Sequence, residues 1–92
     1  MKETLTITNN HFEFLHFLKA KYPLYHLSNI FFRDLHYGVI EFLGMKNQKL
    51  KYTIAENVAK EVAHFFEKKN IFKKIDHQSW VLLYPEFSLR KS

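Results

Sequence analysis

Two Glu-x-x-His pairs are the first residues whose spacing suggests chemistry. Glu13 precedes His16 by three positions, and Glu61 precedes His64 by three positions. Residues three apart on a helix point the same way, and carboxylate-bridged di-metal bundles use two such pairs with Glu from two further helices. On a helical wheel, both pairs lie on the side away from the apolar residues. We therefore expect ordinary surface contacts here and no metal site.

The other nucleophilic and titratable residues form no catalytic pattern. The chain has no Cys, and none of its Ser residues stands in a G-x-S-x-G motif. Its two Gly are isolated, so no phosphate-binding loop is present, and its six His form no H-x-H, H-x-x-x-H or H-E-x-x-H arrangement. A chain of 92 residues also has little volume for both a core and a deep pocket. We expect no enzymatic activity and no cofactor.

Lysine is concentrated in one part of the chain. The segment 46–74 contains eight Lys and three Glu, so its net charge of +5 equals that of the whole chain. Lys attracts phosphate as a flexible point charge, which suits salt-dependent binding better than reading of base sequence. The segment predicts non-catalytic nucleic-acid association through Lys–phosphate contacts, and a solubilising surface is the alternative. The candidate contact residues are Lys46, Lys49, Lys51, Lys68, Lys69, Lys73 and Lys74.

A surplus of aromatic residues supports a second hypothesis, a protein-interaction or homodimerisation module. The chain contains ten Phe, five Tyr and one Trp, and its second predicted helix has apolar residues on two sides. Aromatic-rich surface is typical of protein interfaces. The alternative is that a small domain fills its core with these side chains. The candidate interface residues are Ile30, Tyr37, Ile40, Trp80 and Tyr84.

Length and composition predict a single domain over residues 1–92. Hydrophobic residues make up 47% of the chain, which is enough for a core. No apolar run approaches the roughly 18 residues that span a bilayer, and the first residues lack the apolar region of a signal peptide. We expect a cytoplasmic protein that does not enter a membrane.

Hydrophobic periodicity and turn signals predict five elements. Alternation of Thr with apolar residues over 4–8 indicates a strand. Gly44 is placed to close the second helix in the left-handed conformation. Thr53 and Glu56 form a capping box before the third helix. The predicted elements are strand 4–8, helix 11–21, helix 29–43, helix 54–69 and hairpin 71–84, with residues 89–92 frayed.

This order predicts an α+β fold in which three helices pack on a small antiparallel sheet, formed by the N-terminal strand and the C-terminal hairpin. The stretch FFEKKNIFKKIDHQSWVLLYP, residues 65–85, resembles the last helix and wing of winged-helix domains. The resemblance covers about the final third of the chain and implies a loosely winged-helix-like fold. The connection 45–52 is longer than the tight turn of a helix-turn-helix motif.

Overall fold

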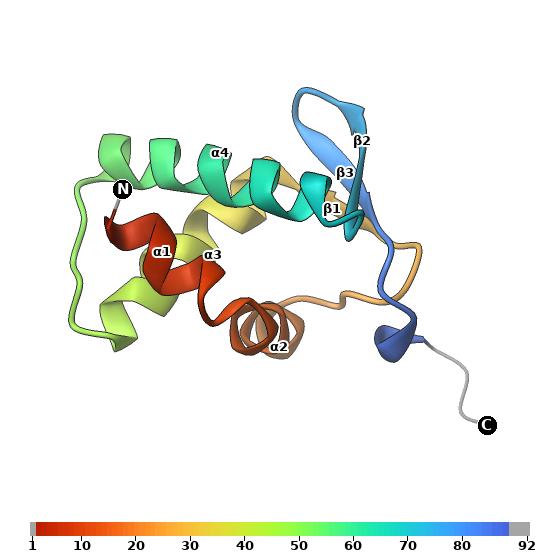
Figure 1. Cartoon of the computed structure of the whole chain (residues 1–92), viewed down its shortest axis with the longest axis horizontal. Helices are drawn as coiled ribbons and strands as arrows, with labels where there is room; N and C mark the ends of the chain where they lie inside the picture. The colour runs from red at the N-terminus through yellow and green to blue at the C-terminus, as the bar shows by residue number, and fades with distance from the viewer. Residues whose placement is uncertain (1, 89–92) are drawn as a thin grey trace.

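The computed structural model describes residues 2–88 as an α+β fold with four α-helices and a three-stranded antiparallel sheet (Figure 1). The α+β class expected from the sequence is confirmed. The fraying predicted for 89–92 lies outside the described residues. None of the described helices is long and apolar enough to cross a membrane. The elements are α1 (Lys2–Thr8), α2 (His11–Lys21), β1 (Asn29–Phe31), α3 (Phe32–Met45), α4 (Tyr52–Lys68), β2 (Phe72–Asp76), β3 (Ser79–Leu82) and the short 3-10 helix η1 (Pro85–Phe87).

The sheet has the strand order β1-β3-β2, so β3 is its central strand. Trp80 of β3 pairs with Ile30 of β1 on one side and with Lys74 of β2 on the other, and both pairings are antiparallel. A bulge interrupts the β2–β3 ladder between Lys74 and Asp76. In Figure 1, α4 runs along the length of the molecule, and the β2–β3 hairpin turns back from the C-terminal end of that helix. The hairpin is therefore held next to α4.

The strand predicted at 4–8 is wrong, because these residues belong to helix α1. A strand would place Leu5 and Ile7 on one face, but Ile7 is fully buried while Leu5 is 57% exposed. The hydroxyl of Thr4 donates a hydrogen bond to Glu61 of α4. Packing of α1 against α4 therefore overrides the local alternation that indicated a strand.

The helix predicted over 29–43 begins later than expected, because Asn29–Phe31 forms the edge strand β1. Ile30 pairs with Trp80 and is only 2% exposed. The backbone N–H of Phe32 donates to a carbonyl in the hairpin turn. The hydrogen bonds of this segment are thus made with β3, and the sheet obtains its third strand from here instead of from the N-terminus.

Each of the two long helices is followed, two residues after its end, by an asparagine whose backbone has the left-handed conformation. α3 continues through Gly44 to Met45, and the residue with positive φ is Asn47, at 62°. The predicted closure at Gly44 is therefore wrong. α4 ends at Lys68 and is followed by Asn70 at φ 61°. Asn tolerates this conformation because its short polar side chain bonds locally.

The helix predicted over 54–69 begins two residues earlier, at Tyr52. Its N-cap is Lys51, whose backbone is extended, and no side chain caps the helix. Thr53 and Glu56 therefore lie inside the first turns, and the predicted capping box does not form. Glu56 instead faces the hairpin, as described below.

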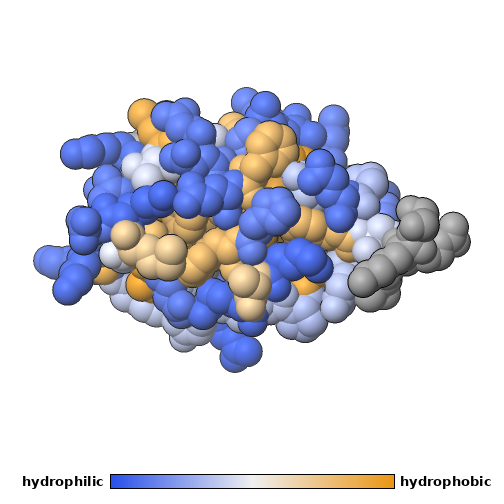
Figure 2. Space-filling model, turned by 90° about the horizontal axis from the view of Figure 1, so that it is seen from below, coloured by the Kyte–Doolittle hydropathy of each residue, from blue (hydrophilic) through white to orange (hydrophobic). Residues whose placement is uncertain are grey.

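The core lies between the helices and the α4-facing side of the sheet. Phe66 of α4 stacks on Phe72 of β2 with ring centroids 4.8 Å apart. A Cβ atom added to Gly38 of α3 would lie 2.3 Å from Cδ2 of Leu18, so α2 and α3 are in close contact here. Seen from below in Figure 2, hydrophilic side chains interrupt the remaining apolar surface. Phe12 of α2 is one of the large apolar residues left exposed, at 54%.

Candidate functional site

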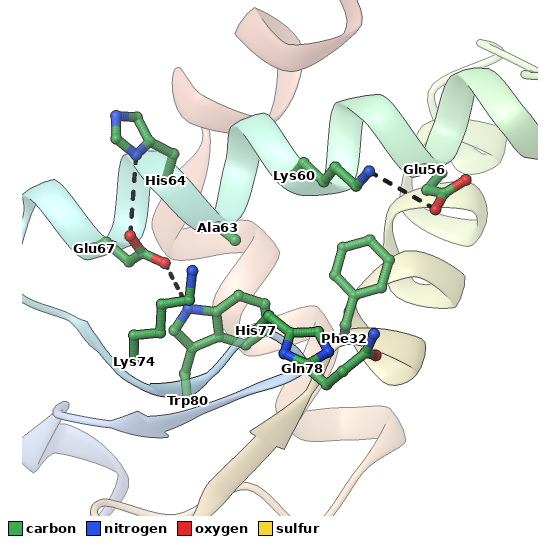
Figure 3. Close-up of a pocket in the computed structure, with 10 residues that line it drawn as sticks. All are labelled: Phe32, Glu56, Lys60, Ala63, His64, Glu67, Lys74, His77, Gln78 and Trp80. Atoms are coloured by element: carbon green, nitrogen blue, oxygen red, sulfur yellow. Dashed lines mark hydrogen bonds and ion pairs between the residues drawn. The ribbon is translucent and has the colours of Figure 1, made fainter.

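An open groove lies between α4 and the β2–β3 hairpin (Figure 3). Its main lobe has a volume of about 460 Å³, and a second lobe has a volume of about 220 Å³. Phe32, Glu56 and Gln78 line both lobes, so the two lobes are adjacent. We treat this groove as the candidate functional site.

One wall of the groove is a single face of α4. Glu56, Lys60, His64 and Glu67 line it at intervals of three or four residues, which is the repeat of a helix. Nζ of Lys60 is 3.9 Å from Oε2 of Glu56, and Nδ1 of His64 is 4.0 Å from Oε1 of Glu67. Each carboxylate of this wall therefore has a basic group one turn away.

The opposite wall is the hairpin, whose turn is organised by Asp76. Oδ1 of Asp76 accepts the backbone N–H of Gln78 at 2.8 Å and the hydroxyl of Ser79 at 2.9 Å. These hydrogen bonds lower the pKa of the Asp76 carboxyl below its ordinary value. The turn brings His77 and Gln78 to the groove, and Lys74 of β2 lines it as well. Figure 3 shows these three side chains across from those of α4.

Trp80 forms the floor between the two walls. Its indole N–H donates to Oε2 of Glu67 at 2.6 Å, which joins β3 to α4 and satisfies a buried donor. Trp80 is 4% exposed, and the Glu67 side chain is 28% exposed. The ring of Phe32 lies 6.4 Å from the indole, centroid to centroid. The floor is therefore aromatic and is held in place by a charge-assisted hydrogen bond.

The second lobe has an aromatic wall at the N-terminal end of α4. Nε2 of buried His36 lies 3.1 Å from the backbone oxygen of Tyr52, and the two rings are 4.3 Å apart. Tyr37 lies 6.5 Å from Tyr52, ring to ring, and these two tyrosines are 41% and 57% exposed. The proximity of Tyr37, together with partial burial, raises the pKa of Tyr52 above its ordinary value. Arg33 also lines this lobe.

The structure separates the seven predicted Lys residues into two groups. α4 has 17 residues, which correspond to about 25 Å of helix rise. One group precedes its N-terminus, and the other surrounds its C-terminus and β2. Nζ of Lys46 is 3.0 Å from Oε2 of Glu13. Within residues 2–88 the other six form no ion pair and are exposed: Lys49, Lys51, Lys68, Lys69, Lys73 and Lys74.

The predicted interface residues do not form one exposed face. Ile30, Trp80 and Tyr84 are buried in the core, at 2%, 4% and 8% exposure. Ile40 is half-buried and packs against the core. Tyr37 is the one predicted member that stays largely exposed. The prediction placed Ile30 on the surface of the helix 29–43, but this residue lies in strand β1.

The two Glu-x-x-His pairs make contacts with different partners. Glu13 binds Lys46, and the ring of His16 lies 5.1 Å from that of Phe87. Glu61 accepts the hydroxyl of Thr4, while His64 lies near Glu67. Within the part of the chain that the structure describes, no three metal-ligating side chains come together.

The sequence patterns single out four of the residues that line the groove, but for separate roles: Glu56, His64, Lys74 and Trp80. No sequence pattern relates Phe32 or Glu67 to a groove. A signal was present in Trp80, because a tryptophan that becomes buried needs an acceptor for its N–H. Only the packing of β3 against α4 shows that Glu67 supplies this acceptor.

Within the groove, positive and negative side chains balance over an aromatic floor. Glu56 and Glu67 face the same space as Lys60 and Lys74. Such a surface suits a planar, uncharged group better than a free anion. Comparisons with protein-family models, with curated proteins and with solved structures found no match for this chain.

Proposed function

We propose that this chain is a cytoplasmic, non-catalytic domain that associates with nucleic acid through Lys–phosphate contacts. The observation that supports this most directly is the junction of α4 and β2. Only residues 69–71 separate these elements, so Lys68, Lys69, Lys73 and Lys74 surround one short connection. All four are exposed and form no ion pair within the described residues. We refer to them as the junction lysines.

The arrangement of α4 and the hairpin supports a winged-helix-like surface. From α2 onward the elements run helix, strand, helix, helix and hairpin, with β3 central in the sheet. The hairpin lies beside α4, so a nucleic acid at the junction lysines would meet both elements. Glu56, Glu61 and Glu67 lie on α4 and would repel phosphates if this helix entered a duplex groove, which favours phosphate contacts from the junction lysines.

The proposal predicts that the affinity for nucleic acid falls with salt concentration, and that this dependence is caused by the junction lysines. Binding of a labelled oligonucleotide is measured by anisotropy over a range of salt concentrations, for the native chain and two triple Lys→Gln variants. In duplex DNA, each phosphate contact contributes about 0.9 to the slope of log K against log salt. We expect the junction variant to flatten this slope and the control to leave it nearly unchanged. The junction variant replaces Lys68, Lys69 and Lys73, and the control replaces Lys46, Lys49 and Lys51.

Two results would contradict this proposal. One is the absence of measurable binding by the native chain at low salt. The other is an equal loss from both triple variants, which would show that the total charge matters and the junction does not.

A second candidate function is self-association or protein binding through Tyr37 and Tyr52. These side chains lie next to each other on α3 and α4 and stay 41% and 57% exposed. Tyr is enriched at protein interfaces because its ring offers apolar area and its hydroxyl can still bind water or a partner. The neighbouring Arg33 belongs to the same class of interface residues.

A further inference from the structure

We propose that the groove between α4 and the hairpin receives one unpaired nucleobase of a bound single strand. The base would lie against the ring of Phe32 and the small part of the Trp80 indole that stays exposed at the bottom of the groove. The phosphates on either side of it would lie outside the groove, on the junction lysines. This inference rests on the proposed function and specifies which form of nucleic acid the chain prefers.

The dimensions of the groove fit such a ligand. The main lobe, at about 460 Å³, falls within the range of about 300–1,000 Å³ that is usual for small-molecule sites. It is open along one side, between α4 and the hairpin, so a polymer can enter without being threaded. The floor is preformed, because the bond between Trp80 and Glu67 fixes the indole. A base therefore meets a rigid surface.

The charges in the groove favour a base over a phosphate as the group that enters. Glu56 and Glu67 offset Lys60 and Lys74, so a phosphate inside the groove would face two carboxylates. An uncharged ring gains stacking on the aromatic floor without this repulsion. The basic residues outside the groove are Lys68 and Lys69 at the end of α4, with Lys74 of β2 at the rim. Lys73 lies on the opposite face of the strand, because consecutive side chains of a strand alternate between its faces. The phosphates consequently remain outside.

The polar side chains of the groove match the edge of an unpaired base. The amide of Gln78 both donates and accepts hydrogen bonds. Oε2 of Glu67 is taken by the Trp80 N–H, and Oε1 of the same carboxylate, 4.0 Å from His64, remains to accept an exocyclic amino group. In a duplex these base edges are paired with the opposite strand. The groove therefore selects single strands.

Trp80 provides a direct reporter, since it is the only tryptophan of the chain. Its fluorescence is followed while a single-stranded oligonucleotide of mixed sequence, or the duplex of the same length, is added to the full chain. Anisotropy of a label on the oligonucleotide measures binding independently. We expect tighter binding of the single strand and a change of Trp80 emission that the duplex does not produce.

Two variants test the groove, and one serves as a control. Phe32→Leu removes half of the aromatic floor, and Gln78→Ala removes a polar group from the exposed hairpin turn with little effect on folding. Phe12→Leu alters an exposed phenylalanine of α2 that does not line the groove. We expect Phe32→Leu to weaken single-strand binding about tenfold, in keeping with the loss of one stacking contact. Duplex binding should stay unchanged in all three variants.

The outcomes separate this inference from the proposed function. If oligonucleotides bind while Trp80 emission is constant, or if Phe32→Leu and Gln78→Ala behave like Phe12→Leu, the groove inference is wrong and the junction proposal stands. If neither nucleic acid binds at low salt, both are wrong. Should Phe32→Leu fail to fold, as judged by circular dichroism, Gln78→Ala and the Trp80 signal decide the matter.

Discussion

Gly38 determines how closely α2 can approach α3. A Cβ atom at this position would lie 2.3 Å from Cδ2 of Leu18, a side chain that is 1% exposed and has little room to move. We expect Gly38→Ala to lower the free energy of unfolding by about 1 kcal/mol. Overpacking costs about 1–3 kcal/mol, and the better helix propensity of Ala returns about 1 kcal/mol. Urea denaturation measures the difference.

A double-mutant cycle tests whether this effect comes from the contact itself. Leu18→Ala alone should destabilise the fold by about 2–5 kcal/mol. In that background Gly38→Ala should become neutral or stabilising, because the clashing methyl group is absent and the propensity gain remains. The same cost of Gly38→Ala in both backgrounds would contradict the steric explanation.

Trp80 illustrates what single residues reveal before a structure is known. A residue type indicates what a side chain requires once it is buried, and tryptophan requires an acceptor for its N–H. The sequence placed Trp80 at an interface, whereas the structure buries it against α4, with Glu67 as acceptor. These residues are 13 positions apart and belong to a helix and a strand, so no local pattern relates them. The requirement of Trp80 for a hydrogen-bond acceptor was predictable, but the identity of that acceptor, Glu67, was not.

The β2–β3 hairpin depends on the charge of Asp76 in its turn. The pKa of this carboxyl is lowered because Gln78 and Ser79 donate hydrogen bonds to it, so the ionised form is favoured in the folded state. The resulting stability is present above the ordinary pKa of 3.8 and is lost as the pH falls through the lower, folded-state pKa. We expect Asp76→Ala to lower the unfolding temperature at neutral pH, with the difference shrinking in strong acid. Thermal unfolding followed from pH 7 downward measures it.

Asp76→Asn separates the charge from the hydrogen bonds. Asparagine keeps one carbonyl acceptor in the turn but cannot ionise. It should recover part of the stability lost in Asp76→Ala, and the difference between these two variants should not change in acid. A difference between the native chain and Asp76→Ala that is constant from neutral to strongly acidic pH would contradict the role of the charge.

The end of α3 offers a stabilising substitution. Gly44 lies within the helix, has no positive φ, and has open space where a Cβ atom would be placed. We expect Gly44→Ala to raise the free energy of unfolding by about 0.5–1 kcal/mol, as measured by urea denaturation. Asn47→Ala is the matched contrast, since its φ of 62° disfavours a β-carbon. It should destabilise the fold, and a loss of stability in Gly44→Ala would show that this glycine is needed.

The elements were predictable where local signals agreed with tertiary packing. Pro23 follows α2 closely, and that helix spans the predicted 11–21. The alternation of Thr with apolar residues over 4–8 predicted a strand, which is wrong. The segment is helical, packs against α4 and buries Ile7 completely. The strand at 29–31 had no local signal of its own. Its hydrogen-bonding partner is β3, about fifty residues further along the chain.

In the whole molecule, the length of α4 decides how charge is distributed. Neighbourhood in sequence suggested that the basic residues of 46–74 lie together. A helix of 17 residues divides them, and the principal axis of the molecule, 40 Å, accommodates both ends. The net charge was therefore predictable from the sequence. Which lysines lie together in space was not, because that depends on where the rigid helix α4 begins and ends. The candidate groove is unpredictable for the same reason, since it requires the hairpin to return beside α4.

The exposed tyrosines lead to a prediction about the assembly of the molecule. If Tyr37 and Tyr52 form a self-association surface, sedimentation velocity should show a larger species that grows with protein concentration. Tyr37→Ser with Tyr52→Ser should restore the monomer, because the exposed aromatic area is lost. Phe12→Ser, an equally exposed aromatic on α2, should leave the association unchanged. A monomer at every concentration would contradict self-association and leave nucleic-acid binding as the function to test.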